Sequence, residues 1–212
     1  MKGGVDTDWN TADAEIIAKL NEIKNNGGTI AVLSSTIISP STKQLIADFS
    51  AAYGNVKHIQ MDAVSYSGIL DANEASFGVR VLPTYNFDKA EVIVSFGADF
   101  LGNWLNADYA KQYVTARNPK NGKMAKHYQV ESTLSLTGSN ADNRIQIKPS
   151  EQKGLLSNLF SALNGATADR RIAKLTNDLK NNTGKSIVVC NSNDTEVQTL
   201  VNAINNKLGN YE

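Results

Sequence analysis

The sequence predicts an α/β fold, in which Rossmann-like parallel sheets are flanked by helices. Two observations indicate this fold class. Short runs of β-branched and other apolar residues, such as Val92–Phe96 and Ser186–Cys190, are typical of strands buried on both faces. Longer segments with apolar residues three or four positions apart, such as Asp194–Leu208, are typical of helices. The two kinds of segment alternate along the chain, and this alternation favours parallel strands joined by helical crossovers.

The first predicted helix has a clear start and a clear end. Asp8 or Asn10 can cap a helix over Thr11–Asn25, whose apolar residues recur at helical spacing. Gly27 and Gly28 follow directly and end that helix.

The same apolar patterns predict the remaining helices and strands. We expect further helices over Thr42–Tyr53, Ser67–Ser76, Ala107–Thr115, Gly154–Leu163, Arg170–Asn181 and Asp194–Leu208. We expect strands over Thr29–Ser34, Asn55–Met61, Val92–Phe96, His127–Glu131, Ile145–Ile147 and Ser186–Cys190. The segment Val79–Asn86 contains Pro83 and has no clear period, so it is expected to be a loop.

The order of the strands suggests two lobes, one of them discontinuous. The strand Ser186–Cys190 lies far from the first strand in sequence, so the two ends of the chain are expected to share one sheet. Residues 1–56 and 150–212 would then form one α/β lobe, and residues 57–149 would form an inserted lobe. One continuous sheet is the alternative.

Composition excludes several classes of function. The 212 residues carry a formal net charge of zero without a basic stripe, which argues against binding to nucleic acid or to an anionic membrane surface. No apolar run approaches the roughly 18 residues of a transmembrane helix. Met1–Gly4 leads directly into polar sequence, so no signal peptide is expected. The chain is therefore expected to be cytoplasmic or a piece of a longer protein.

Residues that carry common catalytic chemistry are scarce. Cys190 is the only cysteine and follows an apolar run, so a buried, unreactive thiol is expected. His58 and His127 each lie in or beside a predicted strand and are expected to be structural. The triplet Gly184-Lys185-Ser186 precedes a strand rather than a helix, so it is not a P-loop. We expect no bound metal, and whether the chain is an enzyme stays open.

The best candidate site follows the strand Val92–Phe96. Ligands of open α/β sheets usually bind outside the carboxyl ends of the strands. There, Gly97 allows close approach of the backbone, and Asp99 can accept hydrogen bonds from sugar hydroxyls. Glu131 follows the next strand, so we expect it near Asp99 at the same edge. The alternative is a plain turn between strand and helix, with Asp99 as a cap.

The order of several segments resembles the molybdopterin oxidoreductase family, which includes dimethyl sulfoxide reductase and formate dehydrogenase. The segments that carry this resemblance are Trp9–Ala14, Gly28–Ser34, Phe87–Asp99, Val130–Pro149, Gly184–Cys190 and Leu208–Asn210. Two phrases, Val94–Trp104 and Glu131–Arg144, are most similar to the large iron–sulfur subunit of alternative complex III. The resemblance covers nearly the whole chain.

This resemblance implies a catalytically silent, structural and interaction part of a respiratory quinol-oxidising electron-transfer complex. The chain would then be a fragment without the family's iron–sulfur domain, held by other subunits at the periplasmic face of the inner membrane, with no cofactor of its own. As an alternative, it would be part of an active enzyme that holds molybdopterin guanine dinucleotide. The vestigial cofactor-binding candidates are then Gly97, Asp99, Glu131, Thr137 and Ser65, the last at the family's metal-ligand position. A third possibility is an unrelated small-ligand binding module.

The hydroxyl-rich segment Ser132–Asn143 would lie over the dinucleotide in a cofactor-holding relative. If the cofactor is absent, apolar side chains are expected to fill the vacated cleft, because their burial is favourable. The candidates are Leu134, Leu136, Phe100 and Trp104.

Overall fold

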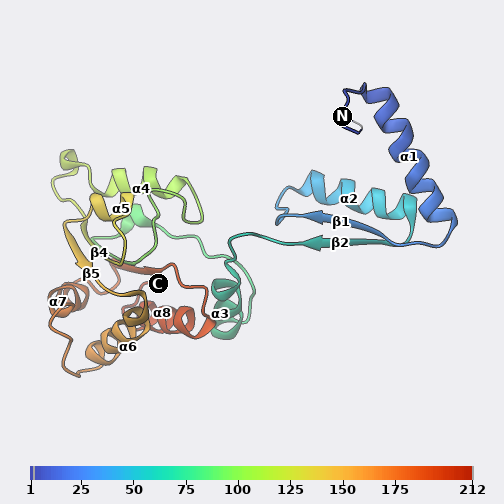
Figure 1. Ribbon diagram of the computed structural model, residues 1–212. Helices are drawn as coiled ribbons and strands as arrows, with labels where there is room; N and C mark the ends of the chain where they lie inside the picture. Colours follow the sequence, from blue (N-terminus) through green and yellow to red (C-terminus); the bar gives the residue numbers. More distant parts are fainter. Residues whose placement is uncertain (2, 212) are drawn as a thin grey trace. The chain divides into compact units, whose positions relative to one another are not determined.

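The computed structural model describes residues 1 and 3–211, and the chain divides into two compact units. Unit 1 comprises Met1–Ser65 and unit 2 comprises Tyr66–Glu212. Both units combine parallel strands with flanking helices, so the predicted α/β fold class is confirmed (Figure 1).

Unit 1 consists of α1 (Trp9–Asn25), β1 (Ile30–Ser34), α2 (Pro40–Tyr53) and β2 (Val56–Gln60). The two strands are parallel and form a two-stranded sheet. Figure 1 shows α2 running alongside β1 and β2. Both helices begin at good caps, because side chains of Asp8 and Ser39 accept hydrogen bonds from backbone N–H groups of the first turn.

Unit 2 begins with α3 (Ser67–Phe77) and continues through a four-stranded sheet. Its strands are β3 (Val92–Phe96), β4 (Lys126–Glu131), β5 (Asn143–Gln146) and β6 (Ser186–Cys190). The remaining helices are α4 (Asp108–Ala116), α5 (Leu136–Ser139), α6 (Gln152–Leu163), α7 (Ala173–Asn181) and α8 (Thr195–Lys207). Short 3-10 helices lie at Phe87–Lys89, Pro119–Asn121 and Pro149–Glu151.

The sheet of unit 2 has the strand order β5-β4-β3-β6, and all neighbouring strands are parallel. Apolar residues from alternate positions of β3, β4 and β6 pack on one face against α6, α7 and α8. The opposite face packs against aromatic residues from α4 and from the loops around β3. Every residue of β3 and β6 is buried, as expected for central strands of a parallel sheet. Figure 1 shows α4 and the pair α6 and α8 on opposite sides of the sheet.

The division between the units differs from the expected discontinuous lobe. β6 pairs with β3 rather than with β1, so residues 150–212 belong with the sheet that was expected to be an insert. The boundary falls between Ser65 and Tyr66, not at residues 56 and 150. The physical reason is that β3 and β6 are buried along their whole length: they pair with each other, and two apolar clusters of unit 2 cover the two faces of their sheet.

Among the described residues, no helix is both long enough and apolar enough to cross a membrane.

Candidate functional site

The carboxyl edge of the unit 2 sheet contains a topological switch point between β3 and β6. The chain leaves β3 toward α4 on one face, whereas it leaves β6 toward α8 on the other face. In open α/β sheets, this divergence leaves a crevice beside the strand ends, where ligands bind. Gly97 follows β3 and Asn191 follows β6, and the Asn191 N–H donates to the Phe96 carbonyl.

A cavity of about 310 Å³ lies at this edge. We call it the edge cavity. Its lining residues are Gly97, Val130, Glu131, Ser132, Thr133, Ser135, Ile147, Pro149, Gln152 and Asn191. Hydroxyl and amide groups predominate in this lining, which contains one carboxylate and no lysine or arginine. The edge cavity therefore offers hydrogen bonds but no side-chain cation for a phosphate group.

Gln152 connects the ends of β3 and β6 across the switch point. Its amide nitrogen lies 2.9 Å from the Phe96 carbonyl oxygen, 3.0 Å from Cys190 Sγ and 3.2 Å from Asn191 Oδ1. Gly97 adopts a φ of +72°, and a Cβ there would lie 2.8 Å from Asn191 Oδ1. Only glycine satisfies both the left-handed backbone and this close approach.

Glu131 is 5% exposed, and four hydrogen bonds occupy its carboxylate. Arg144 Nε lies 2.6 Å from Oε1, and the Ser135 hydroxyl lies 2.7 Å from Oε2. The Ser135 N–H and the Gln129 amide also donate to this carboxylate. Burial alone would raise the pKa of Glu131, but these donors, led by Arg144, hold the pKa below its ordinary value. Glu131 is therefore an ionised anchor rather than a free acid or base.

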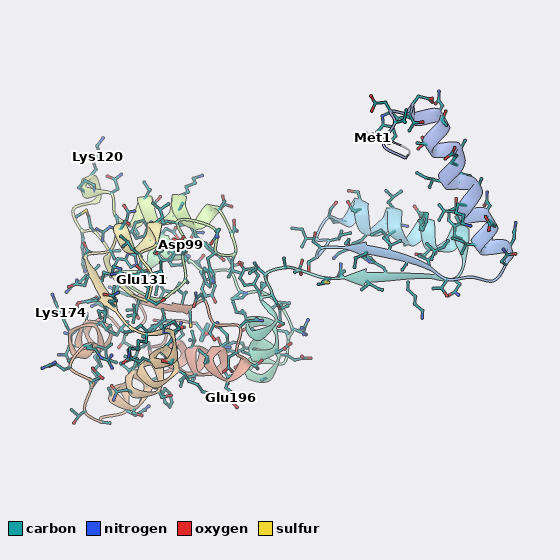
Figure 2. The ribbon with its side chains drawn as sticks, in the orientation of Figure 1. Met1, Asp99, Lys120, Glu131, Lys174 and Glu196 are labelled. Carbon is teal, nitrogen blue, oxygen red and sulfur yellow. The ribbon has the colours of Figure 1, made fainter. Side chains whose placement is uncertain are left out.

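Asp99 anchors the same loop from the other strand. Its Oδ1 accepts hydrogen bonds from the Thr137 N–H at 2.9 Å and from the Thr137 hydroxyl at 2.7 Å. The Thr137 hydroxyl oxygen accepts a further bond from the Leu101 N–H. Asp99 and Glu131 thus both hold α5; Asp99 follows β3, and Glu131 is the last residue of the neighbouring parallel strand β4. The expectation that they lie at one sheet edge is confirmed, and Figure 2 labels both side chains.

Two glycines make room for these carboxylates. A Cβ at Gly138 would collide with Glu131 Oε1, and a Cβ at Gly102 would collide with Asp99 Oδ2. Neither position has a left-handed backbone, so close packing rather than turn geometry requires glycine there. The loops at this edge are therefore packed tightly around the two carboxylates.

A buried polar row continues from Glu131 along the face of β4. Tyr113 Oη lies 3.1 Å from His127 Nδ1, and His127 Nε2 lies 3.4 Å from Gln129 Oε1. Burial lowers the pKa of His127 to about 4, so the imidazole is neutral at pH 7. His127 has the structural environment that the sequence suggested, because aromatic and polar neighbours enclose it.

Four of the five candidate residues come together at this edge, namely Gly97, Asp99, Glu131 and Thr137. Ser65 is instead the last residue of unit 1. Sequence reasoning missed Arg144, Gln152 and Asn191. Arg144 could have been predicted as a partner of Glu131, because it carries the opposite charge and lies on the next strand. No sequence pattern indicates Gln152 or Asn191.

Two of the four apolar side chains expected to be buried are buried, although neither lines the edge cavity. Phe100 and Trp104 are buried in the aromatic core. Leu134 and Leu136 are exposed instead. The cause is the short helix α5, which Ser135 caps by accepting from the Gly138 N–H, and which turns Thr137 and Gly138 inward.

Unit 1 presents a second feature, an open apolar surface. Among its described residues only Ile30 is buried. Leu33 and Ile59 are register partners on neighbouring strands, so they lie on the same face of the sheet, and they are 68% and 49% exposed. We call the face that carries Ala31, Leu33, Lys57 and Ile59 the open face.

The helices of unit 1 also expose apolar residues, including Ile16 and Ile17 on α1 and Leu45 on α2. Parallel sheets in folded proteins are covered on both faces, and two strands alone give little stability. Unit 1 therefore leaves uncovered a surface that this fold normally buries.

Comparison with known proteins found one kind of match only. No family model matches the sequence, and no curated protein matches it. Solved structures do match, among them the formyltransferase/hydrolase complex (FhcABCD) from Methylorubrum extorquens in complex with methylofuran. The TM-score with a chain of that complex is 0.61 at 16% sequence identity. The alignment covers 98% of this chain but only 55% of the other, so the likeness shows the fold alone.

These findings correct the family resemblance drawn from the sequence. The structural neighbour is a formyltransferase/hydrolase complex rather than a molybdopterin oxidoreductase, and no family model supports the latter. The expected roles in alternative complex III, in quinol oxidation and in a molybdopterin enzyme are therefore wrong. The quoted segments are mostly strands with their following turns, and such segments are alike in many α/β proteins. The periplasmic location rested on the same resemblance and is untested.

Proposed function

We propose that this chain is a docking component of a multi-protein assembly, in which the open face of unit 1 packs against another polypeptide. The observation that carries the proposal is the exposure of Leu33 and Ile59, side by side on a parallel sheet. Burying one such side chain contributes roughly 1.5–3 kcal/mol, so a partner that covers the face gains appreciable binding energy.

The chemistry of the open face indicates the kind of partner. Leu33 and Ile59 form an apolar centre, and Lys57 stands beside them as the single charged residue of that face. A helix with an apolar stripe and a flanking acidic residue matches this pattern, because helices are the usual cover of a parallel sheet. The structural neighbour also belongs to a multi-protein complex, which is consistent with such a partner.

The polar side chains at the edge cavity serve the structure of unit 2 rather than a reaction. Glu131, Asp99 and Gln152 are all engaged in hydrogen bonds that hold the loops after β3, β4 and β6. Groups of three or more potential metal ligands are absent among the described residues. A general base needs a carboxylate that is free to accept a proton, and Glu131 is held ionised by Arg144.

The test is isolation of the full chain from its native source under mild conditions, followed by hydrogen exchange. Wild-type chain should co-purify with one polypeptide at fixed stoichiometry, and amides of β1 and β2 should exchange more slowly in the complex than in the free chain. Leu33→Lys, which places a charge on the open face, should abolish both effects. Val114→Lys is the matched control, because Val114 is equally exposed but lies on α4 of unit 2.

Unchanged exchange of β1 and β2 in the complex would contradict the proposal, as would equal co-purification of Leu33→Lys. Analytical sedimentation of the purified chain then tests whether the occupant is a second copy of this chain. If wild type alone forms a dimer that Leu33→Lys dissociates, the occupant is a second copy and the proposed foreign partner is wrong.

A further inference from the structure

A second and larger cavity opens at the opposite, amino end of the unit 2 sheet. Its volume is about 500 Å³, within the range of small-molecule sites. It lies between α3, α8, the loop 78–86 and the segments that lead into β3 and β6. We call it the basal cavity. It is separate from the edge cavity, because the two share no lining residue.

Asparagines hold the basal cavity open. Asn73 donates to the Val81 carbonyl and accepts from Asn202, so it fixes the loop 78–86 to α3 and α8. Asn205 bonds the N–H and the carbonyl of Val188 on β6, and it also accepts from Asn210. These amides are therefore occupied by the protein and set the shape of the cavity rather than its specificity.

One wall of the basal cavity is aromatic and apolar. Phe77 and Tyr211 pack edge to face, with ring centroids 5.1 Å apart, and both rings are about half exposed. Val79, Val81 and Pro83 continue this wall along the loop. Such a surface favours a flat apolar body, because rings stack or pack edge-on against one another.

Several groups at the basal cavity can still donate hydrogen bonds to a ligand, and three of them lie where an anionic group would be held. Tyr85 lines the cavity, and its hydroxyl makes no hydrogen bond to any other residue that the structure describes. Lys89 also lines it, and its ammonium group has no partner among the described residues. Among the described residues, the ammonium group of Lys185 pairs with Glu91 alone, at 3.5 Å. In the part of the chain that the structure describes, the lining contains these two lysines and no acidic side chain, and Glu91, which pairs with Lys185, lies outside it.

We propose that the basal cavity binds an organic anion that joins a flat apolar body to a carboxylate or phosphate group. The body would lie on the wall of Phe77 and Tyr211, and the anionic group would accept bonds from Tyr85, Lys89 and Lys185. Burial raises the pKa of the Tyr85 phenol, so this group remains a donor at neutral pH. The inference is independent of the docking role, because it involves unit 2 alone.

Calorimetric titration of the full chain tests this assignment with three probes of one shape. Naphthoate carries a carboxylate, naphthyl phosphate carries a phosphate, and naphthalenemethanol is neutral. At least one anion should bind about tenfold more tightly than the alcohol, and the tighter of the two identifies the anionic group.

Variants then locate the site. Lys89→Gln combined with Lys185→Gln should weaken the anion about tenfold and leave the alcohol unchanged, and Tyr85→Phe should weaken the anion about fivefold. Lys120→Gln removes an exposed lysine outside the cavity and should change nothing. If the double variant unfolds, Tyr85→Phe decides alone, since it keeps the ring. Equal binding of anion and alcohol, an effect of Lys120→Gln as large as that of the double variant, or no saturable binding would overturn the proposal.

Discussion

The substitution Glu131→Gln tests whether the Glu131 carboxylate stabilises the fold of unit 2. All four groups that face the carboxylate are donors, from Arg144, Ser135 (twice) and Gln129. A glutamine of the same shape presents an NH₂ to two of these donors and leaves the partly buried Arg144 without its charge partner. Loss of one partner of a fully buried ion pair costs about 3–5 kcal/mol. Because Arg144 retains some solvent contact, we expect a loss of about 2–3 kcal/mol.

Urea unfolding followed by fluorescence measures this loss. Trp104 is buried in unit 2, whereas Trp9 is exposed in unit 1, so the change in emission reports mainly on unit 2. Glu91→Gln is the control, because its ion pairs with Lys123 and Lys185 lie at the surface and should contribute less.

The pH dependence of the free energy of unfolding gives a second check on the role of Glu131. The pKa of Glu131 is lowered in the folded protein, so its contribution is fully present above the unfolded value of about 4.3. That contribution disappears as the pH falls through the folded value, and wild type and variant should converge there. A difference below about 0.5 kcal/mol at pH 7, or one that does not change with pH, would refute the reasoning.

Three further predictions follow from the packing of unit 2. Gly138→Ala should destabilise by about 1–3 kcal/mol in urea unfolding, because its Cβ collides with Glu131, whereas Gly154→Ala on α6 meets open space and should stabilise slightly. The His127 ring should titrate near pH 4 in the folded protein by NMR. Because the unfolded chain binds this proton already at about pH 6.5, the free energy of unfolding should decrease as the pH falls from about 6.5 toward 4. Cys190 should react with a disulfide reagent at pH 8 only after urea is added, because burial raises its pKa to about 11; rapid reaction of the folded chain would contradict its burial.

The sequence predicted local structure well, because local structure depends on residues close together in the chain. β3 and β6 have the bounds expected from their apolar runs, and the loop before β3 is where Pro83 placed it. Strand pairing was not predictable in this way. The run Ile30–Ser34 is nearly as apolar as Val92–Phe96, yet one is mostly uncovered and the other is fully buried. The difference arises from neighbours that are distant in sequence.

The site shows the same limit. Parallel strands end at one edge, and this general rule was enough to place Asp99 near Glu131. The other side chains of the site come from distant parts of the chain, since Gln152 lies on α6 and Asn191 follows β6. The rule also does not show that both carboxylates are already occupied. Their hydrogen bonds depend on the inward turn of α5, which a pattern of alternating Leu and Thr does not predict.

The two-stranded sheet of unit 1 has a consequence for how the protein must be produced. In a pair of strands each strand is an edge, so β1 and β2 both keep a row of unpaired backbone N–H and C=O groups beside the apolar open face. Such rows accept any extended chain, including another copy of the same strand. Synthesis in excess of whatever covers this sheet should therefore lead to aggregation or proteolysis that starts within residues 30–60, and the cell would have to match the supply of this chain to that of its cover.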